Sequence, residues 1–383
     1  MRAVGSGRRA EVVERVAIVG LGLIGGSIAA AARRAERPPV LVGVDRDPET
    51  CRFALEQGLV DESVVADEAV ASLLFAPGSF DLVVIATPVD AAIQWLDVFK
   101  DAGFDGIVTD ACSTKSAIVS QAASLDAPFT FIGGHPMAGS ERSGIEAASP
   151  ALFDGAYWVL TPTGGTATEA YRAVHEFVAT LGARPIAIAP EAHDEAVALI
   201  SHVPHVAAAA LVALVADQPA GDEALRLAAG GFKDMTRIAA GSPDLWTGIC
   251  TENAERIADG LARLESVIAR FREAVRGRDS RRIRELLATA ADVRRSLPAR
   301  WVPESSALYE LSIPMRDRPG VISEITTLVG RAGCNIEDVE IDHVSEDSAV
   351  LRLVLTDEGD RDRLLADLVR VGYEPTLRLL GEG

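Results

Sequence analysis

A histidine lies in a segment of small and polar residues, GGHPMAGSERSG, at residues 133–144. The residues before it, FTFIGG, are apolar enough for a buried strand, so His135 is expected near the end of a strand. A free imidazole has a pKa of about 6.5, which makes it a usable general base at neutral pH. The segment therefore predicts proton transfer by His135, and a structural loop histidine is the alternative.

Two further polar stretches, ATP at 86–88 and DACSTK at 110–115, also follow apolar runs. In open parallel sheets, ligands bind beyond the carboxyl ends of the strands, where these stretches fall. Ser113 can therefore hydrogen-bond the same hydroxyl as His135, or it can cap the helix that begins near Thr114.

A candidate anion-binding residue stands in the segment GGFKDMTRIA, where Arg237 follows Asp234 by one helical turn. A guanidinium binds a carboxylate through two parallel hydrogen bonds, which favours recognition of an acidic substrate by Arg237. The alternative is an ordinary surface ion pair between the two side chains.

No metal site is predicted. Three histidines share one helical stretch with Pro204, but their spacing is not H-E-x-x-H and a proline kink disturbs any regular face. The cysteines lie too far apart for a zinc or redox pair and are expected as free thiols in a reducing compartment. These residues are His193, His202 and His205, and Cys51, Cys112, Cys250 and Cys334.

The segment VGLGLIGGS carries Gly20, Gly22 and Gly25 in the G-x-G-x-x-G spacing, directly after an apolar run and before a helical pattern. Such glycines permit a tight turn and let backbone N–H groups approach a pyrophosphate. Asp45 follows at the end of the next strand, where a carboxylate accepts hydrogen bonds from a ribose hydroxyl. It would repel a 2′-phosphate, so NAD is favoured over NADP, although Arg46 partly compensates.

The chain predicts an α/β fold of several parts. Seven apolar runs alternate with helical patterns up to about residue 190, which indicates a Rossmann-type, doubly wound and mostly parallel sheet. Residues 190–297 read as helices that form either half of a dimer core or a bundle within one chain. A ferredoxin-like βαββαβ order follows a proline-containing linker. The predicted boundaries are 1–189, 190–297, linker 298–306, and 307–383.

Composition limits the partners of this 383-residue chain. Its net charge of −19 and pI of about 4.8 make nucleic acids and anionic membranes unfavourable partners. The N-terminal arginines before an apolar run resemble a secretory signal, but Glu11 and Glu14 interrupt them. The later apolar run VAAAALVALVA is about half of what a membrane span requires. We expect a cytoplasmic protein.

Taken together, GLGLIGGS, DACSTK, GGHPMAGSERSG, HDEAVALISHVPH and GGFKDMTRIA…PDLW resemble the prephenate dehydrogenase family of tyrosine biosynthesis. The resemblance implies an NAD-dependent enzyme that oxidatively decarboxylates prephenate to 4-hydroxyphenylpyruvate. It places the catalytic residues on His135 and Ser113, and substrate contacts on Arg237 and the second active-site histidine, His205. Cys112 takes a position where many relatives have glycine.

The remaining site residues follow from the same resemblance and from the glycine motif. Acidic gate residues and a tryptophan lining the site fall on Glu141, Asp234 and Trp246. The cofactor-binding residues are Gly20, Gly22, Leu23, Ile24, Gly25, Asp45, Arg46, Thr87 and Pro88.

The tail, with DRPGVISEI and GCNIEDVEI, resembles an ACT domain, a regulatory module that binds small ligands. The turn before a helix N-terminus can receive a carboxylate, and the implied effector is tyrosine or another amino acid. The candidate effector-binding residues are Asp317, Pro319, Gly320, Asn335 and Ile336. The alternative is a tail with a purely structural or dimerising role. The protein as a whole is expected to form a homodimer.

Three other functions compete with this reading. An arogenate or dual-specificity cyclohexadienyl dehydrogenase differs only in the substrate side chain, and a cationic or hydrogen-bonding His205 slightly favours prephenate. A β-hydroxyacid dehydrogenase shares the cofactor domain but usually relies on a helical lysine. An amino-acid sensor with a vestigial cofactor site is disfavoured because His135, Ser113 and Arg237 are all present.

Overall fold

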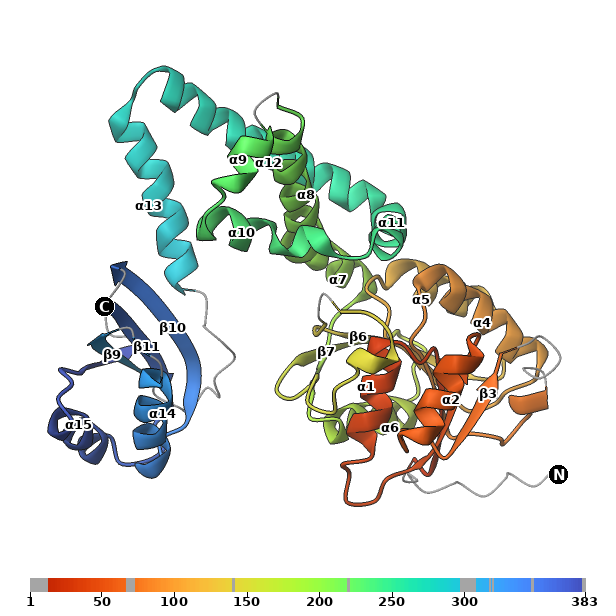
Figure 1. The fold of residues 1–383 in the computed structure, drawn as a ribbon. Helices are drawn as coiled ribbons and strands as arrows, with labels where there is room; N and C mark the ends of the chain where they lie inside the picture. The colour runs from red at the N-terminus through yellow and green to blue at the C-terminus, as the bar shows by residue number, and fades with distance from the viewer. Residues whose placement is uncertain are drawn as a thin grey trace, which may run out of the picture. The chain divides into compact units, whose positions relative to one another are not determined.

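Eight strands form one sheet in the order β3-β2-β1-β4-β5-β6-β7-β8. Figure 1 shows this sheet and the helices that cover it in the red to yellow-green part of the chain. The computed structural model describes residues 13–66, 73–139, 142–218, 221–296, 308–316, 318, 320–345 and 348–380. The strands are β1 (Arg15–Val19), β2 (Val40–Asp45), β3 (Glu62–Val65), β4 (Leu82–Ile85), β5 (Ile107–Asp110), β6 (Thr130–Pro136), β7 (Tyr157–Thr161) and β8 (Arg184–Ala187). The accompanying helices are α1 (Leu23–Ala32), α2 (Pro48–Glu56), α4 (Val89–Asp101), α5 (Ser116–Ser124), the 3₁₀ turn η1 (Ile145–Ala147) and α6 (Thr168–Thr180).

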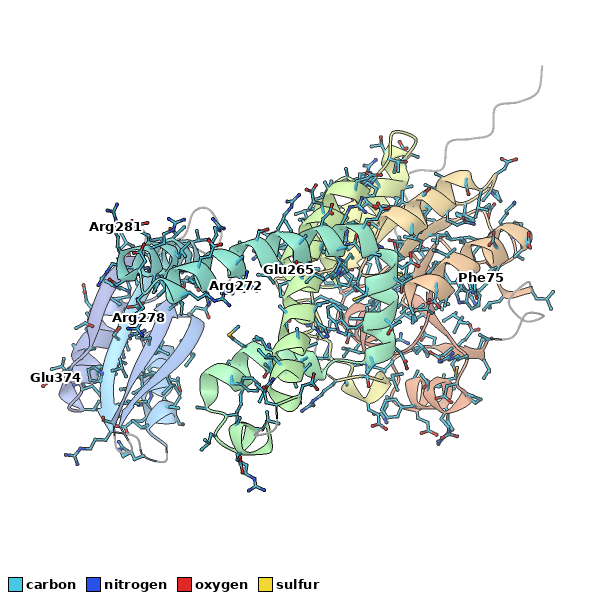
Figure 2. All side chains as sticks on the ribbon, turned by 90° about the horizontal axis from the view of Figure 1, so that it is seen from above. Phe75, Glu265, Arg272, Arg278, Arg281 and Glu374 are labelled. Carbon is cyan, nitrogen blue, oxygen red and sulfur yellow. The ribbon has the colours of Figure 1, made fainter. Side chains whose placement is uncertain are left out.

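Both faces of this sheet are buried, which explains why its central strands are apolar throughout. In β1, Val16 and Ile18 pack into a core with α1 and α6 on one face. The alternate residues Ala17 and Val19 pack with α4 and α5 on the other. Phe75, labelled in Figure 2, is fully buried in this second core among phenylalanine and tryptophan rings. Burying a side chain of this size stabilises the fold by about 1.5–3 kcal/mol.

The prediction of a doubly wound, mostly parallel sheet is confirmed, with two differences. β3 was not predicted, since its residues ESVV include polar side chains suited to the sheet edge. β7 pairs antiparallel with β6 and parallel with β8, so the last two strands run opposite to the others.

A continuous helical run follows the sheet. It comprises α7 (Pro190–Val197), the π-helical turn η2 (Ala198–His202) and α8 (Val203–Ala216). Pro204 has no N–H to donate, and just before it the N–H of Val203 bonds to the carbonyl of Ala198, five residues back. The helical run therefore continues through Pro204, while the π-helical turn before it interrupts the regular α-helical face, as expected.

This run is longer and more apolar than the sequence run VAAAALVALVA suggested. Pro190–Ala216 spans 27 residues and by length and composition alone could cross a membrane, with 33% of its most apolar window buried. His193, Asp194, His202 and His205 on the same run are buried and polar. Those four side chains take part in the site described below, as expected for a core helix of a helical domain.

The other helices of this region are α9 (Gly221–Arg226), α10 (Gly230–Thr236), the 3₁₀ turn η3 (Arg237–Ala240), α11 (Pro243–Glu252), α12 (Ala254–Arg276) and α13 (Ser280–Ser296). By internal contacts the chain divides into two units, residues 1–269 and 270–383, and the division falls within α12. The predicted linker 298–306 lies outside the described residues, and the predicted domain boundaries stay predictions.

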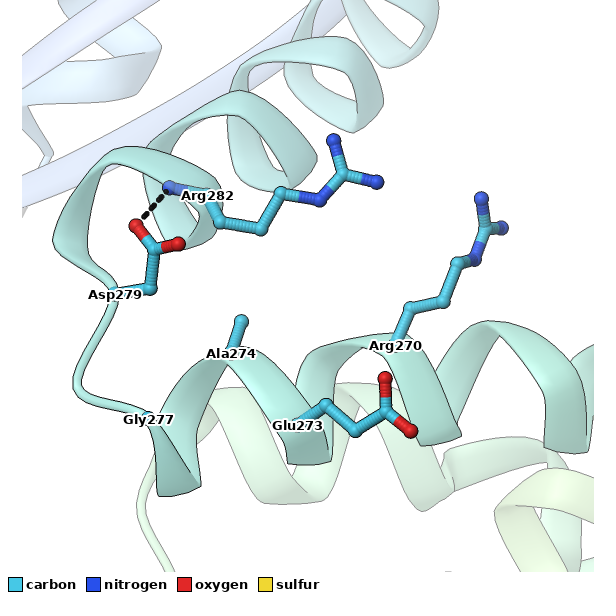
Figure 3. Close-up of a pocket in the computed structure, with 6 residues that line it drawn as sticks. All are labelled: Arg270, Glu273, Ala274, Gly277, Asp279 and Arg282. Carbon is cyan, nitrogen blue, oxygen red and sulfur yellow. Dashed lines mark hydrogen bonds between the residues drawn. The ribbon is translucent and has the colours of Figure 1, made fainter.

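In the second unit, α12 and α13 meet at a turn that encloses a hollow of about 400 Å³ (Figure 3). The backbone N–H of Arg282 donates to Asp279 Oδ1 at 2.9 Å. The lining residues carry both signs of charge and include no predicted site residue. They are Arg270, Glu273, Ala274, Gly277, Asp279 and Arg282.

The tail folds in the predicted βαββαβ order as a four-stranded antiparallel sheet, β10-β11-β9-β12. Its elements are β9 (Leu308–Arg316), α14 (Val321–Arg331), β10 (Ile336–Ser345), β11 (Ser348–Leu355), α15 (Arg361–Arg370) and β12 (Thr376–Leu380). Both helices pack against the sheet. The core between them includes Leu311, Ile325 and Leu364.

Candidate active site

The glycine loop after β1 is tightly packed at two glycines and open at the third. Gly20 has a left-handed φ of +91°, and a Cβ there would lie 2.8 Å from the Ala86 carbonyl oxygen. A Cβ at Gly25 would lie 1.8 Å from the Gly20 carbonyl oxygen, whereas no heavy atom lies within 4 Å of the Cβ position at Gly22. Gly22 caps α1 without a side-chain hydrogen bond, so the first turn at Leu23 and Ile24 presents backbone N–H groups. This cradle fits a pyrophosphate.

Asp45 lies against the same loop. Its Oδ2 accepts from the Leu21 N–H at 2.7 Å, and its Oδ1 accepts from the Asp47 N–H at 3.0 Å. The carboxylate at the end of β2 therefore stands beside the pyrophosphate cradle, where a ribose hydroxyl would lie. Arg46, the next residue, is exposed.

The loop after β4 meets both the glycine loop and the loop after β5. The Thr87 methyl group lies 2.8 Å from the Cβ position of Gly20, and Pro88 precedes α4 as its N-cap residue. The Thr87 carbonyl accepts from Cys112 Sγ at 3.5 Å. Thr87 and Pro88 thus lie beside the cradle, as expected for residues that contact the nucleotide.

His135 lies near the end of β6 and is half-buried as a residue. Its Nδ1 is 2.8 Å from His193 Nε2, and the two rings meet edge to face at 81°. Burial lowers the pKa of His135 well below its usual value, and the nearby His193 and Lys115 act in the same direction. His135 is therefore neutral at neutral pH, as a general base requires.

Asp194 joins this pair of histidines to the start of α5. Its Oδ1 lies 2.8 Å from His193 Nδ1 and accepts from the Lys115 N–H, while its Oδ2 accepts from the Ser116 N–H, both at 2.8 Å. Burial disfavours the charged carboxylate, but the hydrogen bonds from His193 and Ser116 outweigh this and lower the pKa of Asp194 to about 2. Asp194 is therefore ionised and stabilises the N-terminus of α5.

Ser113 lies half-buried in the loop between β5 and α5. The alternative that it caps the following helix is wrong, because α5 begins at Ser116 with Lys115 as its N-cap residue. Asp194, from a distant part of the chain, supplies the carboxylate at that helix end. The role of Ser113 toward a substrate hydroxyl stays a prediction.

A fully buried ion pair, Asp110–Lys115, supports the strand that carries His135. Asp110 also accepts from the Cys112 N–H and, through Oδ1, from the Gly134 N–H, both at 2.9 Å. A side chain at Gly134 would be 2.4 Å from the Asp110 carbonyl oxygen. The loop of Thr87 and the strand of His135 are thus linked through Cys112 and Asp110.

His205 and Trp246 form a second group, on the helical side. Their rings stack at 3.4 Å and 13°, and His205 Nδ1 is buried with no hydrogen-bond partner among the described residues. Burial lowers the pKa of His205. The expectation of a cationic His205 therefore loses support, and a neutral, hydrogen-bonding imidazole remains.

His202 and Asn253 connect the two groups. The His202 ring lies edge-on to Trp246 at 6.0 Å, and its Nδ1 is 3.3 Å from Asn253 Nδ2. Asn253 Nδ2 also donates to the Asp194 carbonyl oxygen at 2.8 Å. Burial lowers the pKa of His202 to about 4. Asn253 stands in none of the sequence motifs. His202 lies in HDEAVALISHVPH and the Asp110–Lys115 pair in DACSTK, but the contacts that give them roles form only on folding.

Arg237 and Asp234 are exposed on the helical side. Asp234 lies in α10, which buries none of its residues, and Arg237 begins η3, which packs against α8. The structure thus places Arg237 on an element that contacts the helix of His205. Glu141, the other predicted gate residue, lies outside the described residues.

In the tail unit, Gly320 has a left-handed φ of +86° and is the N-cap residue of α14. Asn335 directly precedes Ile336 at the start of β10, and its carbonyl accepts from the Thr356 N–H at 3.2 Å. Asp317 and Pro319 lie outside the described residues. The predicted effector site stays a prediction.

Comparison with known proteins gives three family matches along the chain. The families are "Prephenate dehydrogenase, nucleotide-binding domain" at residues 28–187, "Prephenate dehydrogenase, dimerization domain" at 189–289 and "ACT domain" at 309–372. A curated prephenate dehydrogenase from Bacillus subtilis is 34% identical over 92% of this chain and 95% of its own length.

Two solved structures are each similar over about three quarters of this chain. Arogenate dehydrogenase from Synechocystis is 34% identical with a TM-score of 0.62, covering 73% of this chain and 98% of that one. Prephenate dehydrogenase from Aquifex aeolicus, in complex with hydroxyphenyl propionate and NAD+, is 30% identical with a TM-score of 0.67, covering 75% and 99%.

Proposed function

Because this chain belongs to the prephenate dehydrogenase family of NAD-dependent oxidoreductases, we propose that it oxidatively decarboxylates prephenate to 4-hydroxyphenylpyruvate. In this reaction the hydroxyl proton, a hydride from the carbon that bears the hydroxyl, and carbon dioxide all leave the ring, which becomes aromatic. Bound NAD supplies the hydride acceptor. The observation that carries the proposal is the neutral, hydrogen-bonded His135 on a strand linked to the cofactor loop through Cys112 and Asp110.

Different residues are assigned to cofactor binding and to proton transfer. We assign the open cradle at Gly22 and the first turn of α1 to the pyrophosphate, and Asp45 to the ribose of NAD. Asp45 would repel the 2′-phosphate of NADP. His135 accepts the hydroxyl proton, and Ser113 hydrogen-bonds the same oxygen.

The substrate carboxylates need fixed cations because the protein as a whole is acidic. We assign Arg237 to a carboxylate, and His205 and Trp246 to the wall of the site. By the family resemblance, we assign Asp234 and Glu141 to the entrance of the site. Support comes from the stacked His205–Trp246 pair and from the contact of η3 with α8.

Arogenate is the competing substrate, since an arogenate dehydrogenase is similar at 34% identity. Steady-state assays with prephenate and arogenate, each with NAD and with NADP, test the proposal. We expect the highest kcat/KM with prephenate and NAD. A higher kcat/KM with arogenate would reassign the substrate, and no turnover of either would refute the proposed activity.

For the tail, we propose feedback regulation by an amino acid, with tyrosine as the effector. The support is the ACT family match and the helix N-terminus at Gly320. Tyrosine should inhibit the full chain, and a variant without residues 306–383 should keep its activity but lose the inhibition. Inhibition that persists in this variant would place the effector site elsewhere.

We further propose a homodimer in the cytoplasm. The helical region matches a family described as a dimerization domain, and Ile200 and Leu214 are exposed there at 67% and 60%. Apolar side chains exposed to this degree on one helical run favour coverage by a second copy. Sedimentation of the purified protein should give twice the chain mass of 40.4 kDa.

A further inference from the structure

The hydrogen bonds around His193 fix the proton positions on both imidazoles. The Asp194 carboxylate is ionised and can only accept, so the hydrogen between it and His193 belongs to His193 Nδ1. With a single ring proton, on Nδ1, His193 has none on Nε2, which must then accept. His135 Nδ1 therefore donates to His193 Nε2, and the unprotonated nitrogen of His135 is Nε2.

We propose that His193 and Asp194 are positioning residues that hold His135 in the Nδ1–H tautomer and receive positive charge from it during the reaction. This inference rests on the proposed function for its catalytic part. An isolated imidazole is free to take either tautomer. Without the hydrogen bonds to His193 and Asp194, His135 would carry its proton on Nε2 part of the time and could not act as a base there.

The proton balance of the step is simple. The substrate hydroxyl gives its proton to His135 Nε2 while the hydride leaves its carbon. The Nδ1 proton of His135 can then move to His193 Nε2, which leaves His135 neutral and His193 cationic beside the Asp194 carboxylate. No further acceptor is needed, because the positive charge ends 2.8 Å from a fixed anion.

This arrangement also explains how so poor a proton acceptor can serve as the base. Burial is the largest effect that lowers the pKa of His135; His193, Lys115 and His202 act in the same direction, and Asp194 opposes them. Asp194 is held by two backbone N–H groups of α5 and so is fixed relative to the sheet. Its carboxylate is therefore placed to stabilise charge arriving through His193.

The tautomer can be measured without substrate, in the full-length protein labelled with ¹⁵N-histidine. NMR distinguishes a protonated from an unprotonated ring nitrogen, and the chain has only six histidines. We expect His135 with a proton on Nδ1 and none on Nε2 at pH 7. A proton on Nε2 of His135 would overturn the inference whether or not prephenate is the substrate.

Kinetics of His193→Asn test the catalytic part. Asparagine can still donate to Asp194 from the position of Nδ1 but has no group at Nε2 to reach His135. We expect kcat to fall roughly 10- to 10²-fold, with KM for prephenate and NAD affinity nearly unchanged. His175→Asn, on α6 and outside the chain of hydrogen bonds, is the matched control. Unchanged kcat in His193→Asn would overturn the relay.

The pH dependence of Asp194→Asn adds a readout that a purely structural role would not move. Removing the Asp194 carboxylate, which raises the pKa of His135, lowers that pKa further, and the base must be unprotonated to act. The acidic limb of kcat/KM should therefore move to lower pH while the maximum falls. An unmoved limb would contradict the proposed role of Asp194, and retained NAD binding checks that the variant is folded.

Discussion

The two halves of the candidate site are built differently. Around His135, every partner that positions the ring is buried and hydrogen-bonded: His193, Asp194 and the Asp110–Lys115 pair. On the other side, Arg237 and Asp234 are exposed to solvent, and helix α10 buries none of its residues. The groups proposed for proton transfer are thus fixed before substrate arrives, whereas those proposed for carboxylate binding lie on a surface that a ligand can still reach.

This difference predicts where mutations will act. Substitutions on the buried side should lower the stability of the fold or kcat, because rigid, desolvated groups leave no room for adjustment. Substitutions on the exposed side should mainly raise KM.

Lys115→Met is expected to have the largest effect. It leaves the Asp110 carboxylate buried without its cation, which should reduce the free energy of unfolding by about 3–5 kcal/mol. Urea unfolding measures this loss, with the exposed Lys100→Met on α4 as the control. A loss equal to that of the control would mean that the buried side is not held by this pair.

Lowering the pH should destabilise the buried side of the site, around His135, because His202 becomes protonated. Its pKa is lowered to about 4 in the folded protein, so the unfolded chain binds more protons below pH of about 6.5. The stability that the neutral ring provides is present above pH 6.5 and is lost as the pH falls toward 4, by about 3 kcal/mol. His202→Asn should show a smaller loss of unfolding free energy between pH 7 and pH 4.5. Equal losses in both proteins would rule out His202 as the source.

His135→Asn tests the buried side directly. Removing the base should lower kcat by about 10²-fold or more, with little change in KM, because the interaction lost is with the transferring proton. Steady-state kinetics with prephenate and NAD measure both constants. An unchanged kcat would remove His135 from the mechanism.

Arg237→Gln should give the smallest effect and a different pattern. Loss of a guanidinium–carboxylate contact should raise KM for prephenate about tenfold and change kcat less. Arg226→Gln, on exposed α9, is the control. A normal KM in Arg237→Gln would assign this arginine a structural role and remove the contrast between the two halves.

The same contrast explains what could be predicted from sequence. The glycine loop, Asp45, the parallel sheet and the βαββαβ tail follow local patterns, since each depends on residues close together in the chain. The antiparallel β7 and the Asp194 cap of α5 depend on contacts between distant segments. Asp194 stands 78 residues from Ser116, and no spacing rule connects them.

The candidate site divides in the same way. His135 could be named because it follows a strand in a recognisable motif. Its partner His193 was noticed only as one of three histidines on a helix, since the 2.8 Å contact that gives it meaning forms on folding. Asn253 and Lys115 were missed as site residues because a single buried asparagine or lysine has no sequence signature.

The most direct test of proton transfer by His135 is the position of its ring in a crystal structure of the protein with NAD and hydroxyphenyl propionate. We expect His135 Nε2 at about 3 Å from the ligand's ring hydroxyl, with Nδ1 still hydrogen-bonded to His193. A ring turned so that Nε2 faces His193, or a hydroxyl bound out of reach of His135, would contradict it.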